Sequence, residues 1–265
     1  MNTKVWLVVA GMTFITAACN KVPITGRKQM NLLPESTLVG MSLTNYRDFL
    51  KQNPPVASGQ TDAQLVSRVG NKIATAVKAY MKSQNLTDRI KDYQWEFNLV
   101  NENTVNAWCM PGGKVVVYSG LLPVTKDETG LAVVMGHEIA HAIARHGNER
   151  MSQGLLVQLG GIGLSVAMSE KPEETRNLFM QSYGVTSTLG VLAYSRKHEL
   201  EADKMGLIFM AMAGYDPSQA VSFWERMAQT GGAKPPELIS THPSDATRIK
   251  EIKAYLPEAM KHYKK

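Results

Sequence analysis

The sequence is poor in cysteine, in aromatic residues and in long apolar runs, and each shortage excludes a class of protein. Cys19 and Cys109 are the only cysteines among 265 residues, so no disulfide framework is implied, and we expect Cys109 to be a small core residue. Aromatic residues make up 7% and hydrophobic residues 44%, which argues against a disordered chain and against a polytopic membrane protein. Lys and Arg outnumber Asp and Glu by 29 to 23 but form no basic stripe, so we expect no nucleic-acid partner.

The first residues have the pattern of a secretory signal. Lys4 precedes an apolar run from Val5 to Ala18 that ends in small residues. The run is shorter than the roughly 20 residues that a membrane-spanning helix needs, so we expect it to be removed. Residues 1–18 are therefore predicted to be a signal peptide.

The residue that follows this segment suggests a lipid anchor. Cys19 comes directly after two alanines, which resembles the lipobox of bacterial lipoproteins, although Thr16 stands where leucine is usual. The resemblance implies lipidation of Cys19 and a chain tethered to the membrane on the periplasmic side of the envelope. Simple secretory cleavage after Ala18, with Cys19 a free thiol, is the alternative. Asn20 is not the acidic residue often linked to inner-membrane retention, which favours the outer membrane.

Turn residues divide the rest of the chain into a linker and one domain. Residues 19–34 contain Pro23, Gly26 and Pro34 among polar residues, and we predict that they link the anchor to a domain at 35–265. An apolar, glycine-containing segment at 155–168 is too short to span a membrane. We expect it to be a buried helix or a mobile cover over a cleft.

Apolar periodicity predicts an α+β fold that is mostly helical, with one small antiparallel sheet. A T-x-x-E capping box from Thr125 to Glu128 and a stop at Gly147 bound the central helix. Helices are expected at about 37–50, 62–82, 126–146, 195–213 and 244–259, and strands at 93–100 and 114–120.

The motif "HEIAH" in the central helix has the spacing of a metal site. His137 and His141 are four residues apart, so both imidazoles can reach one ion from one face of the helix. Neutral imidazoles bind zinc, and a carboxylate that is not a ligand, here Glu138, can take a proton from water that the metal activates. His146 lies about half a turn of rotation away and is excluded as a ligand. If the match is accidental, both histidines are surface residues.

A catalytic zinc site needs a third protein ligand, and the segment "SRKHELEADKMG" offers one. Glu199 and Asp203 are four residues apart on one helix face, whereas Glu201 points to the other side. Glu199 can therefore bind the ion, while Asp203 accepts the remaining N–H of a ligand imidazole. Alternatively, Asp203 is a carboxylate on the helix surface and Glu199 is part of an i, i+4 pair that only supports the helix. His198 is expected at the surface or at the edge of the core.

Together, "HEIAH", "SRKHELEAD" and "THPSDATRI" resemble the gluzincin metalloendopeptidases of peptidase family forty-eight. This family includes HtpX, the CAAX prenyl protease and the Oma-type mitochondrial protease, and the resemblance covers about residues 35–257. It implies one zinc ion per chain, bound by His137, His141 and Glu199, with Glu138 as general base and acid.

The same resemblance implies that His242 and Arg248 lie near the active site. His242 would donate a hydrogen bond to the oxyanion that forms on the scissile carbonyl. From the residues alone, His242 could equally lie in a loop, because Pro243 follows it.

The stretch "NAWCMPGGKVVVYSGLL" resembles the family's strand beside the cleft. An exposed edge there would let an extended substrate add as another strand. The residues expected to meet the substrate backbone are Asn106, Ala107, Val115, Val116 and Val117. If the stretch is an internal core strand, it offers no such edge.

The sequence thus predicts a zinc-dependent endopeptidase of the bacterial cell envelope that acts on polypeptide substrates. The family resemblance implies that these substrates are misfolded or damaged proteins. A zinc-stabilised envelope chaperone or binding protein that does not cleave is the alternative. The sequence leaves the oligomeric state and the cleavage preference open.

Overall fold

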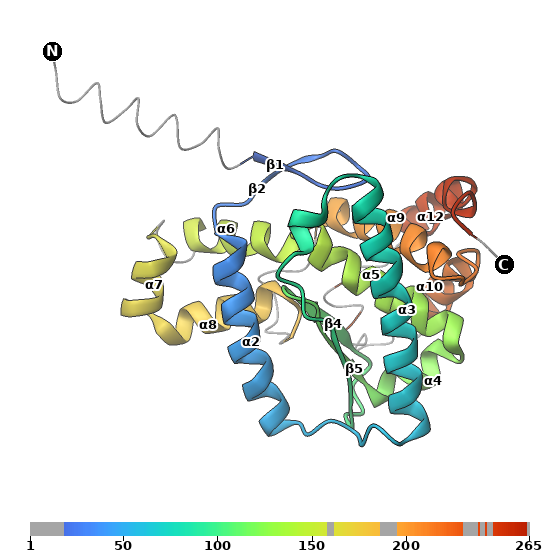
Figure 1. Cartoon of the computed structure of the whole chain (residues 1–265), viewed down its shortest axis with the longest axis horizontal. Helices are drawn as coiled ribbons and strands as arrows, with labels where there is room; N and C mark the ends of the chain where they lie inside the picture. Colours follow the sequence, from blue (N-terminus) through green and yellow to red (C-terminus); the bar gives the residue numbers. More distant parts are fainter. Residues whose placement is uncertain are drawn as a thin grey trace, which may run out of the picture.

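The computed structural model describes residues 19–157, 162–185, 195–229, 238, 242 and 246–263. Most of these residues are helical, and one three-stranded sheet lies among the helices (Figure 1), which confirms the mostly helical α+β fold. The predicted signal peptide, residues 1–18, lies outside the described residues. In chain order the elements are β1 (Cys19–Lys21), β2 (Lys28–Met30), α2 (Glu35–Gln52), α3 (Thr61–Ser83), η1 (Thr87–Ile90), β3 (Glu96–Val100), β4 (Ala107–Met110), β5 (Lys114–Tyr118), η2 (Ser119–Leu121), α4 (Leu122–Thr125), α5 (Glu128–Ile143), α6 (His146–Val157), α7 (Leu164–Glu170), α8 (Pro172–Ser182), α9 (Arg196–Met212), α10 (Gln219–Gln229) and α12 (Ala246–Met260).

The three-stranded sheet is mixed, which corrects the prediction of a purely antiparallel one. Its strand order is β3-β5-β4, with β5 parallel to β3 and antiparallel to β4. A tight turn joins β4 to β5, and Gly112 and Gly113 supply its left-handed residues with φ of 81° and 80°. That hairpin occupies one side of β5, and β3 pairs on the other side, parallel to β5.

The sheet separates two hydrophobic cores, since successive side chains of a strand point to opposite faces. The larger core is formed with α3, α5 and α9, and receives Ala107, Cys109, Val115 and Val117. The smaller core is formed with α2, α6 and α8, and receives Trp108, Met110, Val116 and Tyr118. Cys109 is fully buried, as predicted, and burial raises the pKa of its thiol.

The helix predicted at 126–146 is in fact two helices. The Asp127 carboxylate, rather than the predicted box that starts at Thr125, caps α5 by accepting a hydrogen bond of 2.7 Å from the Gly130 N–H. At the other end, Arg145 adopts a left-handed φ of 60°, which ends the first helix before α6 begins at His146. The His146 side chain therefore points in a different direction from the one that a continuous helix would give it.

Two glycines let α5 and α9 approach closely. A Cβ placed on Gly206 would lie 3.0 Å from the carbonyl carbon of Gly136 and 3.0 Å from the backbone nitrogen of His137. Neither backbone atom can move aside as the end of a flexible side chain could. The close crossing brings the two helices that carry the predicted metal ligands within side-chain reach.

The segment 19–34, predicted to be a linker, packs on the domain. Strands β1 and β2 pair antiparallel, and Val22 in the turn between them is buried in the larger core. From the same turn, Arg27 forms ion pairs with Glu149 of α6 at 2.7 Å and Glu201 of α9 at 2.8 Å. The hairpin therefore contacts both helices directly.

The apolar stretch at 155–168 does not form one buried helix. It includes the end of α6, where Val157 is 83% exposed, and the start of α7, where Ala167 is buried against α8. Residues 158–161 between them lie outside the described residues. Among the described helices, none combines the length and the apolar character that crossing a membrane requires.

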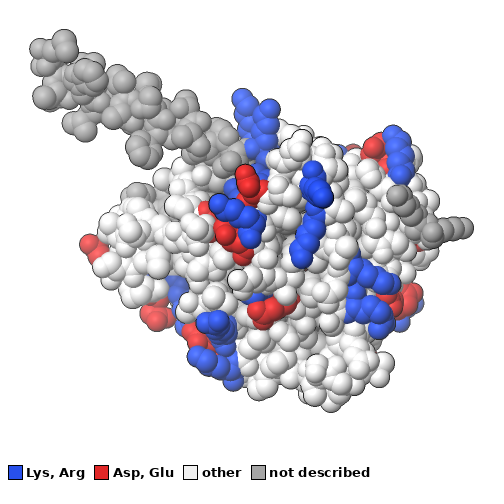
Figure 2. Space-filling model, in the orientation of Figure 1, with Lys and Arg blue, Asp and Glu red and all other residues white. Residues whose placement is uncertain are grey.

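The surface carries charges of both signs. Figure 2 shows Lys and Arg side chains interspersed with Asp and Glu on the face in view, without a continuous basic band there. Several charged residues of the described chain form exposed ion pairs, such as Lys253 with Glu225 at 2.9 Å and Arg68 with Glu128 at 2.9 Å. Such pairs contribute little to stability individually and do not mark a binding site.

Candidate metal centre

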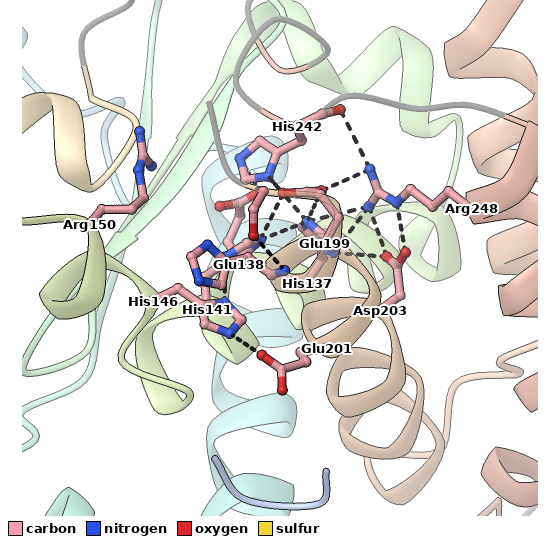
Figure 3. Close-up of polar contacts among 12 residues, drawn as sticks. His137, Glu138, His141, His146, Arg150, Glu199, Glu201, Asp203, His242 and Arg248 are labelled. Carbon is pink, nitrogen blue, oxygen red and sulfur yellow. Dashed lines mark hydrogen bonds and ion pairs between the residues drawn. The ribbon is translucent and has the colours of Figure 1, made fainter. Parts of the chain in front are cut away.

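Four buried side chains converge where α5 crosses α9 (Figure 3). His137 and His141 come from α5 and Glu199 from the first turn of α9, while His242 lies between α10 and α12. Each offers one ligand atom, and these atoms lie within 4.8 Å of one another. The structure therefore brings together the three predicted ligands and adds His242 to them.

The distances among the three predicted ligands are close to those around a tetrahedral zinc ion, although His137 and His141 lie somewhat closer together. His137 Nε2 lies 3.0 Å from His141 Nε2 and 3.3 Å from Glu199 Oε2, and His141 Nε2 lies 3.5 Å from Glu199 Oε1. Bonds of about 2.0–2.2 Å at tetrahedral angles place ligand atoms roughly 3.3–3.5 Å apart. Two imidazoles and one carboxylate are also a donor set that zinc uses in catalytic sites.

The charge balance of the centre also favours a cation. Glu138, Glu199 and Asp203 are almost completely buried, and the Arg248 guanidinium pairs with Glu199 and Asp203. The charges of His242 and Arg248 outweigh the effect of burial and hold the pKa of Glu199 well below its ordinary value. Buried carboxylates are stable when they are paired or bind a metal, so a metal cation bound here would have carboxylate charge to balance it.

The imidazoles of the two predicted histidine ligands differ in pKa. Burial holds the pKa of His141 well below its ordinary value, so its nitrogen lone pair is available. For His137, burial and Arg248 act in the same direction, but hydrogen bonds to Asp203 and Glu199 outweigh them and raise its pKa to about 9. A cation at Nε2 of His137 must therefore displace a proton.

Asp203 lies behind His137, where the helix spacing predicted it. Its Oδ1 is 2.9 Å from His137 Nδ1, the nitrogen that points away from the cluster. The Arg248 guanidinium, predicted near the site, holds the same carboxylate through hydrogen bonds of 2.6 and 2.8 Å and contacts Glu199 Oε2 at 2.9 Å. It also lies over the Trp224 ring at 3.7 Å, which fixes the plane of the guanidinium.

Glu138 lies beside the cluster without belonging to it. Its Oε1 accepts no hydrogen bond within the described part of the chain and lies 3.5 Å from His242 Nε2. Burial raises its pKa, although the neighbouring histidines act against the shift. A buried carboxylate with a raised pKa and an unsatisfied oxygen is suited to taking and returning a proton.

His242 lies in the centre, in agreement with the family resemblance. Its Nδ1 is 3.0 Å from Glu199 Oε1 and 3.3 Å from His137 Nε2. Its backbone N–H donates to the Leu238 carbonyl at 2.9 Å, and its own carbonyl accepts from Arg248 at 3.5 Å. These contacts hold the imidazole over the ligand cluster.

The predicted substrate strand is only partly compatible with the structure. Strand β5 is central, and the residues expected to meet the substrate backbone there, Val115, Val116 and Val117, are fully buried and paired on both sides. That part of the prediction is wrong, because β3 occupies the edge that a substrate would use. Ala107 lies in the edge strand β4, and Asn106 just before it uses its carbonyl to accept from the Tyr118 N–H at 3.1 Å.

Sequence reasoning missed a second group of buried polar residues next to the ligands. His146 and Glu149 are three residues apart on α6, as His198 and Glu201 are on α9, and the pairs interact crosswise. His146 Nε2 lies 3.1 Å from Glu201 Oε2, and His198 Nε2 lies 3.0 Å from Glu149 Oε2. The available signal was this repeated i, i+3 spacing of a histidine and a glutamate.

Comparison with known proteins places the chain among metallopeptidases. Residues 67–256 match the family described as Peptidase family M48. The chain is 32% identical to mitochondrial metalloendopeptidase OMA1 of Schizosaccharomyces pombe over 257 residues, which cover 96% of this chain and 71% of that protein. It is also 32% identical to OMA1 of Saccharomyces cerevisiae over 258 residues, covering 92% and 71% of the two chains.

The chain is also similar to bacterial proteins. The chain is 28% identical to a putative beta-barrel assembly-enhancing protease of Vibrio cholerae over 254 residues, which cover 89% of this chain and 49% of that protein. The chain thus spans about half of this relative, and 71% of the two fungal ones.

Proposed function

The chain belongs to peptidase family M48 and is a zinc metalloendopeptidase, and we propose that it acts in the bacterial cell envelope with Glu138 as its proton carrier. The observation that carries the proposal is the convergence of His137, His141 and Glu199 around one position, with the Glu138 carboxylate beside it. These three residues would hold the ion and Glu138 would not.

Each residue of the centre has a separate task in peptide-bond hydrolysis. A zinc ion bound here supplies Lewis acidity toward a water molecule and toward the scissile carbonyl. Glu138 takes a proton from the attacking water and later delivers it to the leaving amine. Its raised pKa suits both steps, because the protonated form is then a stable intermediate state. No covalent bond between the chain and the substrate is needed.

The remaining residues orient and stabilise. Asp203 accepts the Nδ1–H of His137, and Arg248 holds Asp203 in place. His242 has its Nε2 next to Glu138, so it can donate a hydrogen bond to the oxyanion that forms when water attacks the carbonyl. Ala107, in the edge strand β4, and Asn106, just before it, remain the candidates for contact with the substrate backbone.

An envelope location is supported by two independent features. The bacterial relatives are named beta-barrel assembly-enhancing proteases, and Cys19 follows a segment with a lipoprotein-type signal pattern. We infer a signal peptide at 1–18, lipidation of Cys19 and a catalytic domain at 35–265, with the outer membrane as the anchoring site. Misfolded or damaged envelope proteins would be the substrates.

Proteolysis of casein by the purified chain, with and without a zinc chelator, tests this function. We expect cleavage that stops with the chelator and returns with zinc. Glu138→Gln should reduce cleavage by about 10²- to 10⁴-fold and keep one zinc ion per chain, since proton transfer and ligation belong to different residues. Activity near that of the wild type would refute the role of Glu138. Binding of unfolded casein without any cleavage would instead indicate a chaperone.

A further inference from the structure

A chain of hydrogen bonds runs from His141 to the N-terminal hairpin. His141 Nδ1 lies 2.9 Å from His146 Nδ1, and His146 Nε2 lies 3.1 Å from Glu201 Oε2 (Figure 3). Glu201 also accepts hydrogen bonds from Arg27 Nε at 2.8 Å and from the Thr25 hydroxyl at 2.7 Å. Thr25 and Arg27 belong to the turn between β1 and β2, so the chain of bonds connects this hairpin to the metal centre.

Metal binding by His141 permits one arrangement of protons along this chain. Ligation uses the Nε2 lone pair and leaves the proton of the neutral imidazole on Nδ1. His141 Nδ1 then donates to His146 Nδ1, and His146 carries its own proton on Nε2 and donates it to Glu201. The negative charge of Glu201 favours this tautomer of His146. The charge of Glu201 thus leaves Nδ1 of His146 unprotonated, so this nitrogen can accept the hydrogen bond from His141.

Further contacts prevent the His146 ring from turning. It stacks on the His198 ring with centroids 4.4 Å apart and planes 26° apart, and His198 donates to Glu149. Arg27 connects the His146–Glu201 pair with the His198–Glu149 pair, because it donates to Glu149 at 2.7 and 3.0 Å as well as to Glu201. His146 is completely buried, so water does not compete for these hydrogen bonds.

We propose that His146, held by Glu201 and Arg27, is the positioning residue of the zinc ligand His141, and that docking of the β1–β2 hairpin is therefore required for tight zinc binding. The proposal rests on the proposed function, because it takes His141 to be a zinc ligand. It extends the metal centre from the two motif helices to the N-terminal segment of the chain.

Zinc affinity of two variants of His146 tests the positioning role. His146→Leu keeps the volume of the side chain but removes the acceptor, and should raise the zinc dissociation constant about 10- to 100-fold. His146→Asn places an amide oxygen near the position of Nδ1, and should restore zinc binding to within about threefold of the wild type. The dissociation constants are measured on the full chain by competition with a chromophoric chelator. Cobalt-substituted samples should show altered ligand-field absorption for the leucine variant only.

A change in the hairpin tests the second half of the proposal with less risk to folding. Arg27 is partly exposed, so Arg27→Met should leave the metal-free protein folded and raise the zinc dissociation constant at least threefold. Arg68→Met is the matched control, because Arg68 pairs with Glu128 on the surface without contacting any imidazole of the centre. The control should bind zinc like the wild type. Unfolding temperatures in chelator report whether each variant is folded.

The outcomes separate this proposal from the proposed function. If the wild type binds no zinc, the function itself fails. If the wild type binds zinc and His146→Leu binds it within twofold with an unchanged cobalt spectrum, the positioning role is wrong. If His146→Leu does not fold, Arg27→Met decides: a threefold loss supports the proposal, and affinity equal to that of Arg68→Met overturns it.

Discussion

The two imidazoles of the H-E-x-x-H motif are held from opposite ends of the chain. His137 donates to a carboxylate, Asp203, which Arg248 of the C-terminal helix α12 fixes. His141 donates instead to a neutral imidazole, that of His146, which the N-terminal hairpin fixes through Glu201. At its outer nitrogen, the predicted ligand His137 is therefore supported directly by a charge, whereas the printed contact of His141 Nδ1 reaches a charge through a second ring.

This difference assigns separate tasks to the two sides of the centre. The C-terminal side consists of His137, Asp203 and Arg248. The N-terminal side consists of His141, His146, Glu201 and the β1–β2 hairpin. A carboxylate next to an imidazole raises its basicity, and the pKa of His137 is accordingly raised to about 9 in spite of burial. Among the described residues, the outer nitrogen of His141 meets the imidazole of His146 instead of a carboxylate, and burial lowers the pKa of His141. The C-terminal side thus strengthens a ligand, and the N-terminal side mainly orients one.

Removal of a predicted ligand should have the largest effect, because without bound zinc the two sides can no longer be compared. His141→Ala leaves two of the three predicted ligands, so we expect loss of stoichiometric zinc and of all measurable proteolysis. Metal analysis of the purified variant, beside a peptide-cleavage assay, measures both. Full retention of zinc would show that His141 is not a ligand.

The stability of the metal-free protein should depend on pH in opposite ways on the two sides. The pKa of His146 falls from 6.5 to about 4 on folding, because of burial, so its contribution is lost as the pH decreases from 6.5 to 4. The pKa of His137 rises from 6.5 to about 9, so its contribution is lost as the pH increases from 6.5 to 9. Each shift corresponds to a free energy of the order of 3 kcal/mol.

Urea unfolding in chelator between pH 4 and 9 measures the free energy of unfolding and its two limbs, the loss below pH 6.5 (the acidic limb) and the loss above it (the alkaline limb). Asp203→Asn should flatten the alkaline limb and leave the acidic one, whereas His146→Leu should do the reverse. If either variant changes both limbs equally, the two sides are not independent.

A matched pair of carboxylate-to-amide changes compares the two sides through zinc binding. Asp203→Asn removes the charge that contacts a ligand directly, so zinc affinity should fall about 10- to 100-fold. Glu201→Gln removes a charge one ring further away, and the loss should be smaller. Chelator competition measures both, and an equal or reversed order would contradict the assignment of tasks.

The helix crossing is common to both sides, and its disturbance should weaken them together. Gly206→Ala places a Cβ about 3.0 Å from the backbone of Gly136 and His137, which forces the helices apart. We expect a loss of about 1–3 kcal/mol in the free energy of unfolding, as for overpacked cores, together with weaker zinc binding. Unchanged stability and zinc affinity would show that the close approach is not needed.

The C-terminal side could be predicted from the sequence because its information is local. The i, i+4 spacing of His137 with His141 and of Glu199 with Asp203 sets each pair on one helix face. Elsewhere in the chain, apolar periodicity likewise predicted the helices at 37–50 and 62–82. The family resemblance added His242 and Arg248, which the structure brings to the same centre.

The N-terminal side could not be predicted because it depends on the backbone and on distant contacts. The left-handed Arg145 breaks the central helix and redirects His146, whereas a continuous helix would turn it away. Arg27 reaches glutamates more than 120 residues away, in a segment whose proline and glycine content suggested a linker. The parallel pairing of β3 with β5 is likewise a tertiary choice that strand alternation does not encode.

Anomalous diffraction at the zinc absorption edge, from crystals of the zinc-loaded chain, tests the central claim most directly. One strong peak should lie about 2.0–2.2 Å from Nε2 of His137, Nε2 of His141 and a carboxylate oxygen of Glu199, with Glu138 outside bonding distance. A peak bound by Glu138, or no zinc between α5 and α9, would contradict the account.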